Sequence, residues 1–310
     1  MPIPEVDKIW MNGELVDWRD AQVHLLTHAL HYGSGVFEGI RAYKTERGPA
    51  VFRLTDHLER LRRSAKLYYM ELPYTVAELA QATKELIHAN GLEHCYIRPI
   101  VYRGYGEMGL FPLEAPIDCA VAVWPWGTYL GEEGVKHGVR VKVSSIKSLD
   151  NNAITPAAKG CGQYLNSQLA KIEVVKAGYE EAVMLNNAGF VTQGTGENIF
   201  MVRNGRIVTP PLATGLLEGI TRDTVMRIAA SLGHEVVERD FTRADLAIAD
   251  EAFFTGTAAE VVPIREIDDH PIGEPGPLTQ EIQRIFDEII SGRSAAFAHY
   301  LEYVDEAVKA

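Results

Sequence analysis

The chain has 310 residues, of which 46% are hydrophobic, so it is long enough to bury the core of one or two domains. Its formal net charge of −12 argues against nucleic-acid binding, although a local basic pocket is still compatible with a phosphate ligand. No signal peptide is evident, and no apolar run approaches the roughly 18 residues that span a bilayer. Three widely spaced cysteines (Cys95, Cys119 and Cys161) indicate reduced thiols. We therefore expect a cytoplasmic protein with no membrane partner.

Hairpins and helices follow one another along the chain. The expected elements are a hairpin at 9–16, helices at 55–70 and 75–91, strands at 119–126 and 139–145, a helix at 162–178, hairpins at 182–193 and 199–210, and helices at 220–233 and 277–292. Asn12-Gly13 and Asn204-Gly205 are the clearest hairpin turns, because this dipeptide adopts positive φ readily. Asp56 and Glu59 have the spacing of a capping box. The helices at 75–91, 162–178, 220–233 and 277–292 each finish on a glycine, which is typical of a helix end.

These elements predict a two-domain α/β protein with mixed, largely antiparallel sheets, because most of the strands come as hairpins. The segment 126–138 is rich in glycine and charge and has strands on both sides. We expect a smaller N-terminal α/β domain at 1–126, an interdomain linker at 127–138 and a larger C-terminal α/β domain at 139–310.

Three common functional motifs receive no support from the sequence. GYGEMG at 104–109 matches a dinucleotide-binding pattern, but Leu110 and a proline follow it where the pattern requires a helix. His24, His28 and His31 have helical spacing, but no carboxylate or cysteine completes a metal-ligand set, so we expect no metal. The nucleophile elbow of a hydrolase, Gly-x-Ser-x-Gly, is absent.

The segment TPAAKGCGQYLNSQLA, 155–170, places Lys159 among small residues that would let a flat ligand approach its stem. A partly desolvated lysine has a lowered pKa, and the neutral amine can form a Schiff base with a carbonyl compound. The alternative is an ordinary surface lysine in front of a helix.

Features that suit a phosphate favour the first interpretation. LLEGITRDTV offers glycine and threonine at a helix start, where backbone N–H groups attract an anion. TGTAAEVV, 255–262, is a second turn of small residues, and Arg60 lies on a helical face that need not point to solvent. A lysine, two amide-lined turns and an arginine together indicate pyridoxal 5′-phosphate.

With these features the chain closely resembles the branched-chain amino acid aminotransferases, which are fold-type IV pyridoxal-phosphate enzymes. The resemblance covers nearly the whole length. Its motifs are IWMNGELV, THALHYGSGVFEGIRAY, FRLTDHLERLRRSAK, CYIRPIVYRG, AVWPWGTYLG, PAAKGCGQYLNSQLA, GENIF, LEGITRD and FTGTAAEVVP. It implies two domains around a cleft that holds the cofactor, the C-terminal domain being a pseudo-barrel that carries the lysine.

The resemblance also implies roles for single residues. Lys159 would be the Schiff-base lysine, and Tyr164 would bind the phenolic oxygen of the cofactor. The phosphate would be held by Arg60, Ile220, Thr221 and Thr257. The substrate carboxylate would meet Tyr96, Thr257 and Ala258, and the side-chain pocket would be walled by Phe37, Trp126, Tyr129 and Tyr164. A partner subunit would supply Tyr32 and Leu110, so we expect a homodimer or a dimer-based hexamer.

The expected reaction is ping-pong transamination. An L-leucine, L-isoleucine or L-valine donor gives its 2-oxo acid, and 2-oxoglutarate gives L-glutamate, with Lys159 as the proton carrier. Arg98 would pair with the side-chain carboxylate of the acidic substrate, because a carboxylate in an apolar pocket is costly unless paired. The alternative is that Arg98 makes a structural ion pair. A D-amino acid aminotransferase and an aminodeoxychorismate lyase on the same fold are the other enzymes considered. The sequence does not rank the branched-chain substrates, nor does it separate a biosynthetic role from a degradative one.

The stretch VTQGTGENIF, 191–200, departs from the family. Gln193 stands where the family normally has a glutamate that binds the pyridine nitrogen of the cofactor. A neutral amide forms a weaker bond to a protonated nitrogen than a carboxylate does, so we expect a weaker electron sink and a slower reaction. Glu197 is a candidate substitute, but the glycines around it make its direction unreadable. A weakly active cofactor-binding variant is therefore an alternative.

Overall fold

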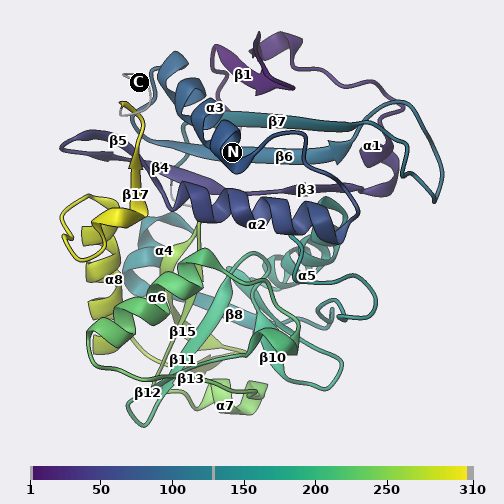
Figure 1. Cartoon of the computed structure of the whole chain (residues 1–310). Coiled ribbons are helices and arrows are strands. Elements are labelled where there is room, and N and C mark those ends of the chain that lie inside the picture. The colour runs from purple at the N-terminus through teal and green to yellow at the C-terminus, as the bar shows by residue number, and fades with distance from the viewer. Residues whose placement is uncertain (1–2, 128–129, 306–310) are drawn as a thin grey trace. The chain divides into compact units, whose positions relative to one another are not determined.

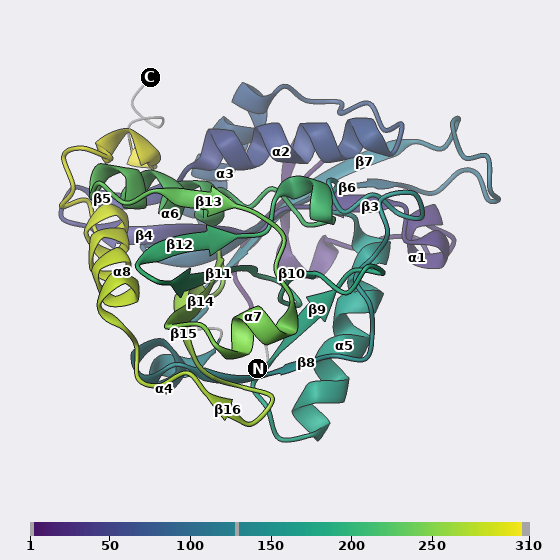
Figure 2. The same cartoon turned by 90° about the horizontal axis from the view of Figure 1, so that it is seen from below.

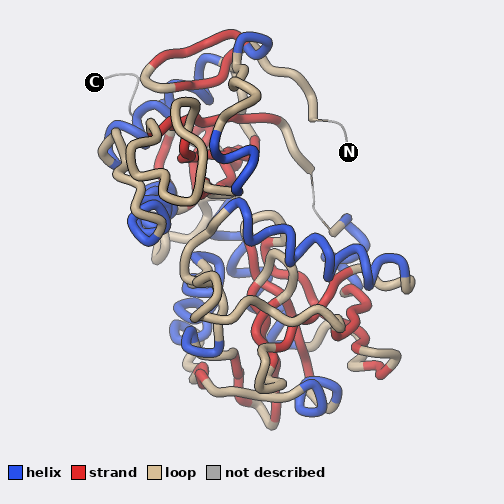
Figure 3. Tube along the Cα trace, turned by 90° about the vertical axis from the view of Figure 1, so that its right-hand side faces the viewer, coloured by secondary structure: helices blue, strands red, loops and turns tan. Residues whose placement is uncertain are grey.

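The computed structural model describes residues 3–127 and 130–305. Contacts between Cα atoms divide the chain into two compact units. The first unit comprises Met1–Trp126, Ala158–Gly162 and Glu288–Ala310, and the second comprises Gly127–Ala157 and Gln163–Asp287. Both units mix helices, strands and loops, as Figure 3 shows by colour, and this confirms the α/β class.

The first unit is built on an antiparallel sheet. Within the part of the chain that the structure describes, the sheet has eight strands in the order β17-β5-β4-β6-β7-β1-β2, with β3 beside β6. Its strands are β1 (Lys8–Met11), β2 (Glu14–Asp17), β3 (Gly35–Phe37), β4 (Ile40–Thr45), β5 (Gly48–Phe52), β6 (Cys95–Arg103), β7 (Ile117–Trp124) and β17 (Leu301–Tyr303). Its helices are α1 (His28–Tyr32), α2 (Leu54–Leu67) and α3 (Val76–Ala89), with 3₁₀ turns at Trp18–Asp20 and Ala298–Tyr300.

The two faces of this sheet differ in character. On one face, apolar side chains such as Ile40 and Ile97, which are register partners, form a core with α2 and α3. Figure 1 shows these two helices beside the strands. On the other face lie Arg41 and its register partner Tyr96, because side chains alternate along a strand. Charged and aromatic groups therefore gather on the face away from the helices.

The second unit has a mixed sheet. Among the described residues it has nine strands in the order β10-β9-β8-β15-β14-β11-β12-β13, with β16 beside β15. The strands are β8 (Val139–Val143), β9 (Glu181–Leu185), β10 (Val191–Gln193), β11 (Asn198–Arg203), β12 (Arg206–Thr209), β13 (Val236–Glu238), β14 (Glu251–Gly256), β15 (Glu260–Ile267) and β16 (His270–Pro271). The pairs β8–β9, β8–β15 and β12–β13 are parallel and the others antiparallel.

Helices surround this second sheet. They are α4 (Gly131–His137), α5 (Tyr164–Lys176), α6 (Ile220–Ser231), α7 (Arg243–Ala247) and α8 (Pro277–Ile290), with 3₁₀ turns at Cys161–Gln163 and Leu212–Thr214. Figure 2 shows α5 along β8 and β9, and contacts between these elements agree. Helix α5 packs through Ala170 and Val174, which are fully buried against the sheet.

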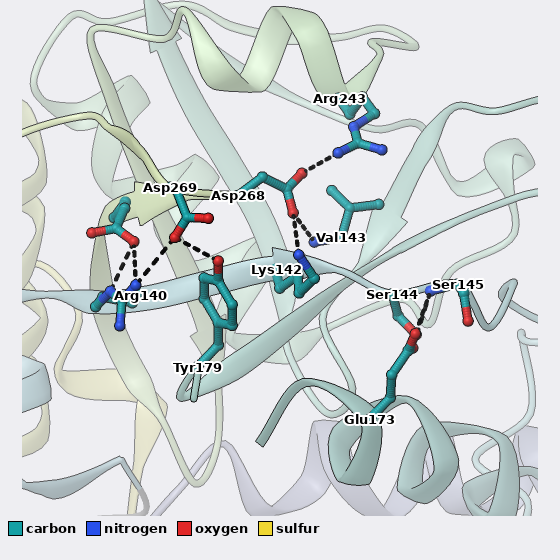
Figure 4. A network of polar contacts seen from close by, with 11 residues as sticks. Arg140, Lys142, Val143, Ser144, Ser145, Glu173, Tyr179, Arg243, Asp268 and Asp269 are labelled. Atoms are coloured by element: carbon teal, nitrogen blue, oxygen red, sulfur yellow. Dashed lines mark hydrogen bonds and ion pairs between the residues drawn. The ribbon is translucent and has the colours of Figure 1, made fainter. Parts of the chain in front are cut away.

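A polar network fastens the β15–β16 turn to its neighbours (Figure 4). The turn residues Asp268 and Asp269 have positive φ, which suits a tight hairpin turn. Asp268 accepts from the backbone N of Val143 at 3.0 Å and pairs with Arg243 at 2.5 Å. Asp269 accepts from the Tyr179 hydroxyl at 2.7 Å, and this hydrogen bond is the main reason that the pKa of Tyr179 is raised to about 12. The turn thus joins β8, α7 and the segment before β9.

The predicted hairpin turns and helix ends are confirmed. Asn12-Gly13 and Asn204-Gly205 have positive φ at both residues, as a two-residue hairpin turn requires. Glycines follow α3, α5, α6 and α8, all with positive φ. The capping box expected at Asp56 is wrong, because α2 starts after Arg53, whose side chain makes no cap.

The contact-based units differ from the predicted domains in three segments. The predicted linker, 127–138, contains helix α4, which contacts β15 within the second unit. Ala158–Gly162 groups with the first unit because Gly160 bridges Val36 of β3. The C-terminal segment also joins the first unit, since β17 pairs with β5. The lysine segment thus packs with the N-terminal residues.

Candidate active site

Lys159 is held by its backbone in the first unit. Its N–H donates to the Ser64 hydroxyl of α2 at 3.0 Å, and its carbonyl accepts from the N–H of Phe37 at 3.0 Å. The side chain is half-buried, with Nζ at 5.4 Å from the centre of the Phe37 ring. A Cβ on the next residue, Gly160, would come within 2.3 Å of the Tyr68 hydroxyl, so any larger residue would require Tyr68 to move. Both sides of the lysine are therefore fixed by close packing.

Arg60 of α2 lies in a buried cluster of charged and polar side chains with Glu38 and His57. Its Nε and Nη2 donate to the two carboxylate oxygens of Glu38 at 2.7 and 2.8 Å, and His57 Nδ1 lies 2.8 Å from the same carboxylate. Burial alone would raise the pKa of Glu38, but Arg60 and His57 outweigh it and hold the pKa well below its usual range. Burial lowers the pKa of His57 despite Glu38. The cluster thus fixes the orientation of the Arg60 guanidinium.

Arg98 lies among aromatic rings on the helix-free face of the first sheet. The centre of its guanidinium is 4.6 Å from the Phe37 ring centroid and 5.3 Å from that of Tyr96, and Nη2 donates to the Tyr96 hydroxyl at 3.3 Å. Its Nε is buried and has no hydrogen-bond partner among the residues that the structure describes. No carboxylate among the described residues forms an ion pair with it. A buried donor without a partner costs about 1–3 kcal/mol, which suits a group that waits for an anionic ligand.

Trp126 extends this aromatic group. Its ring packs edge-on to Tyr96 at 4.5 Å between centroids, and its carbonyl accepts from Arg41 Nη2 at 3.5 Å. Tyr96 is 5% exposed and Phe37 9%, so the rings form a mostly dry surface beside Arg98. Such a surface favours an apolar side chain.

In the second unit, Gln193 ends β10 where the register with β9 shifts. Its Oε1 accepts from the N–H of Leu217 at 3.1 Å, and Asn198 Nδ2 donates to the carbonyl of the same residue at 3.0 Å. Glu197 is 5% exposed, and its Oε2 accepts from the N–H of Gly196 at 3.0 Å. The Glu197 carboxylate thus folds back onto the turn that follows Gln193.

Two backbone segments lie near Gln193 in the same unit. Leu217, its hydrogen-bond partner, comes three residues before α6, whose N-cap Gly219 makes no side-chain cap. A Cβ at Gly219 would fall within 1.9 Å of Asn198 Oδ1, so glycine keeps the start of α6 in place. The turn of Thr257 and Ala258 follows Gly256, where a Cβ would lie 3.4 Å from the carbonyl of Gly196. The second unit therefore gathers an amide side chain, a helix start and a tight turn.

The comparisons with known proteins agree with this arrangement. Residues 35–267 match the family described as amino-transferase class IV. The chain belongs to this family. It is 47% identical to the branched-chain-amino-acid aminotransferase of Pseudomonas aeruginosa, over 94% of this chain and 95% of that protein. It is 41% identical to the enzyme of that name from Escherichia coli K12, over 99% and 100% of the two chains. The crystal structure of the branched-chain aminotransferase from Thermoproteus uzoniensis with norvaline superposes with a TM-score of 0.93 at 45% identity, covering 96% and 99% of the chains.

Class IV aminotransferases use pyridoxal 5′-phosphate, and the residues present fit that group. The second unit offers a helix start without a side-chain cap, where backbone N–H groups favour a phosphate. The first unit offers Lys159, a half-buried lysine followed by Gly160, which packs closely against Tyr68. Gln193, which the sequence predicts to face the cofactor ring, offers an amide there, which lacks the charge of a carboxylate.

The remaining predicted residues have varied surroundings. Tyr164 opens α5 and is half-buried, and Ile220 and Thr221 are buried in the first turn of α6. Tyr32 and Leu110 are 46% and 92% exposed. Tyr129 lies outside the described residues.

The three histidines considered as metal ligands in the sequence have other hydrogen-bond partners in the structure. His28 bonds Ser34 and the carbonyl of Gly109, while His31 bonds the carbonyl of Leu25. No group of three metal-ligating side chains occurs in the described residues. In the same part of the chain, no helix is long and apolar enough to cross a membrane.

Glu38 and His57 were not predicted as site residues from the sequence. They lie in the motifs FEGIRAY and TDHLERL, in which only neighbouring residues had a predicted role. One signal was available, since His57 and Arg60 are three residues apart and share a helical face. Glu38 offered none, because its partners are 19 and 22 residues away along the chain.

Proposed function

We propose that the chain catalyses ping-pong transamination between L-leucine, L-isoleucine or L-valine and 2-oxoglutarate, giving branched-chain 2-oxo acids and L-glutamate. The observation that carries the proposal is the helix-free face of the first sheet. On that face, the guanidinium of Arg98 lies between aromatic rings and has no carboxylate partner among the described residues. One of these rings, Phe37, is also the ring next to Lys159 Nζ. The names of the relatives in Pseudomonas aeruginosa and Escherichia coli support the same activity.

Pyridoxal 5′-phosphate, when bound, supplies an aldehyde carbon for a lysine amine and a conjugated ring that accepts electrons. Lys159 would hold the cofactor through its Nζ, and the same amine, once the substrate amine has replaced it, would carry a proton away from the substrate Cα and return it. Its fixed backbone limits the positions that Nζ can reach, which favours a single proton path. Tyr164 and Gln193 bind polar atoms of the ring.

The cofactor phosphate is assigned to Arg60, to the backbone at Ile220 and Thr221, and to Thr257. Ile220 and Thr221 support this role because they form the first turn of α6, where the N–H groups and helix dipole attract an anion. Glu38 takes two of the Arg60 donors, so the guanidinium is oriented but partly neutralised. The backbone N–H groups therefore carry a large part of the phosphate binding.

The substrate pocket must accept both an isobutyl chain and a carboxylate. Phe37, Tyr96 and Trp126 provide the apolar surface. Arg98 provides a cation that the rings partly stabilise when a leucine side chain lies beside it. When 2-oxoglutarate binds, its distal carboxylate satisfies the donors of Arg98. The α-carboxylate of either substrate is assigned to Tyr96, Thr257 and Ala258.

A homodimer, or a hexamer built from dimers, is also part of the proposal. Tyr32 and Leu110 are assigned to the pocket of a partner subunit, and their exposure of 46% and 92% in the single chain supports this. Further exposed apolar side chains occur in the same two segments, namely Leu25, Leu26, Leu30, Tyr105, Met108 and Phe111. A cytoplasmic location stays a prediction, which the three free cysteines support.

The test is a spectral half-reaction. The purified holoenzyme is mixed with single amino acids, and the cofactor absorbance band is followed. We expect the band to bleach with L-leucine, L-isoleucine and L-valine and to return with 2-oxoglutarate. Lys159→Ala should remove the response while the cofactor phosphate site stays intact. Bleaching with D-amino acids alone would assign a D-amino acid aminotransferase, and pyruvate release from aminodeoxychorismate would assign the lyase. A bleach with L-leucine that takes many minutes would indicate the weakly active variant.

A further inference from the structure

A cavity with a volume of about 440 Å³ lies wholly within the second unit. It is lined by Arg203, Asn204, Arg206, Val208, Val237 and Arg239, and these residues are called the arginine pocket below. They come from the ends of three neighbouring strands, β11, β12 and β13. Three arginines around one cavity are unusual in a chain whose net charge is −12.

The strand register places the arginines and valines of this pocket on one face of the sheet. Arg203 lies opposite Arg206 in the β11–β12 hairpin, and Val208 lies opposite Val237 in the parallel β12–β13 pair. Residues two apart on a strand share a face, so Arg206 joins Val208 there. Arg239 continues the pattern beyond β13, because its N–H still donates to the carbonyl of Thr209. The common face is therefore set by backbone pairing.

The same register separates the charges into two ends. On β12, Arg206 comes two residues before Val208, and Arg203 of β11 lies opposite Arg206. On the neighbouring chain segment, Arg239 comes two residues after Val237, the register partner of Val208. Four residues of parallel strand span roughly 13 Å, so the backbone positions of the arginines at the two ends are about that far apart. Arginine side chains are long, so the guanidinium groups can lie closer together than the backbone positions do. Val208 is 3% exposed and, with Val237, forms an apolar floor between the two ends.

The positive charge of the pocket is incompletely balanced. Arg203 pairs with Asp250 at 2.9 Å, and the other oxygen of that carboxylate accepts from the N–H of Asn204. Arg239 donates to the carbonyl of Asp240 at 3.3 Å, and its charge also acts on Asp245, whose main partner is Thr242. Arg206 is exposed, and its side chain makes no polar contact with the residues that the structure describes. No acidic side chain lines the cavity itself. The pocket thus keeps donors for an added anion at both ends.

We propose that the arginine pocket binds a small, elongated dianion that has an anionic group at each end and an apolar middle. Arg203 and Arg206 hold one anionic group, Arg239 holds the other, and the two valines contact the middle of the ligand. Carboxylate, phosphate and sulfonate groups all suit a guanidinium, since its planar donors can engage two oxygens together.

This pocket is separate from the residues around Gln193. Strand β11 begins at Asn198, which bonds Leu217 beside Gln193, and it ends five residues later at Arg203. Five residues of strand span about 17 Å. The proposal therefore stands whether or not the assigned transamination is correct.

The test uses the holoenzyme and synthetic sulfonates, which do not react with an amine. Binding of 1,3-propanedisulfonate, 1-propanesulfonate and sulfate is measured by calorimetry at low ionic strength. The disulfonate is expected to bind at least about tenfold more tightly than either of the others, because only it reaches both ends. Arg206→Gln and Arg239→Gln are each expected to weaken its binding about tenfold, since each removes a charge-assisted contact.

The matched control is Arg227→Gln, which removes the same charge from an exposed position of α6. It is expected to leave disulfonate binding unchanged within about twofold. Equal losses in all three variants would show attraction by net charge alone and would overturn the proposal. Equal affinity for the disulfonate and the monosulfonate would do the same, and this comparison needs no variant. Absence of binding up to about 10 mM would also refute it.

Discussion

Replacing Gln193 by glutamate tests the predicted role of this side chain at the ring nitrogen of the cofactor. Gln193 Oε1 already accepts from the N–H of Leu217 at 3.1 Å, so a carboxylate can keep that bond and offer a second, charged oxygen. If the side chain binds the cofactor ring nitrogen, the charged oxygen stabilises the protonated form of that nitrogen. We expect Gln193→Glu to speed the half-reaction with L-leucine.

The size of the gain follows from two opposing effects. A hydrogen bond to a charged group contributes about 1 kcal/mol more than a neutral bond. Glu197 opposes part of this gain, since a Cβ on the intervening Gly194 would lie 2.7 Å from its Oε2, and a nearby like charge disfavours ionisation. A net gain of up to about 1 kcal/mol corresponds to an increase of up to about fivefold in the rate.

The assay is stopped-flow absorbance of the half-reaction, together with the dissociation constant of the cofactor and the unfolding temperature of the apoprotein. Gln168→Glu adds the same charge at an exposed position of α5 and should leave all three unchanged. An unchanged rate in Gln193→Glu, with cofactor affinity and stability preserved, would show that the amide is adequate and that the reasoning is wrong.

Three further changes test other parts of the structure. Arg98→Met should lower kcat/KM for L-glutamate at least tenfold more than for L-leucine, because only the acidic side chain needs the cation; equal losses would favour a structural role. His57 is buried, and burial lowers its pKa from the value of 6.5 that it has in the unfolded chain. Below pH 6.5 the unfolded chain therefore binds a proton that the folded chain does not, and the free energy of unfolding falls as the pH falls. His57→Gln should make that fall shallower by up to about 1.4 kcal/mol per pH unit in urea unfolding, and an unchanged slope would contradict the cause given. Asp268→Asn should lower the free energy of unfolding by about 1–3 kcal/mol, because it weakens the bonds to Val143 and Arg243. Asp17→Asn, in an exposed ion pair, should lower it by less than about 1 kcal/mol. Similar losses in both variants would show that the network in Figure 4 does not stabilise the chain more than a surface pair does.

The parts of the fold that the sequence predicted correctly depend on single residues and their φ angles. Asn12-Gly13 and Asn204-Gly205 form the expected turns because asparagine and glycine tolerate positive φ. Glycines end four helices for the same reason. These preferences act within a few residues, so a reader of the sequence can find them without knowing the tertiary structure.

The start of α2 shows where local rules fail. Arg53 has left-handed backbone angles at the N-cap, and its N–H donates to the carbonyl of Tyr300, nearly 250 residues later in the chain. Its side chain pairs with Asp56, which the sequence suggested as a capping residue. Capping boxes are instead found at the start of α3, from Thr75 and Glu78, and at the start of α7, from Thr242 and Asp245. A long-range contact therefore decided a conformation that local propensity did not.

The candidate site divides in the same way. Lys159 and Arg60 could be selected from residue type and from their neighbours, but Glu38 could not, since its carboxylate acquires a role only when α2 packs against β3 and β4. The direction of the Glu197 side chain could not be predicted, because Gly194 and Gly196 in front of it break strand alternation. In the structure its carboxylate accepts from the N–H of Gly196.

Arg98 is the residue for which the structure adds most. In the sequence it supported two interpretations, a structural ion pair or a group reserved for the substrate. Strand pairing places it on the same face as Phe37, Tyr96 and Trp124, and the rings of all three lie within 5.8 Å of its guanidinium centre. Aromatic faces stabilise a cation without neutralising it, whereas a carboxylate would occupy its donors. Since no carboxylate of the described residues pairs with Arg98 and its Nε has no hydrogen-bond partner, the surroundings favour a cation kept for an anionic ligand. One pocket can then accept leucine and glutamate in turn.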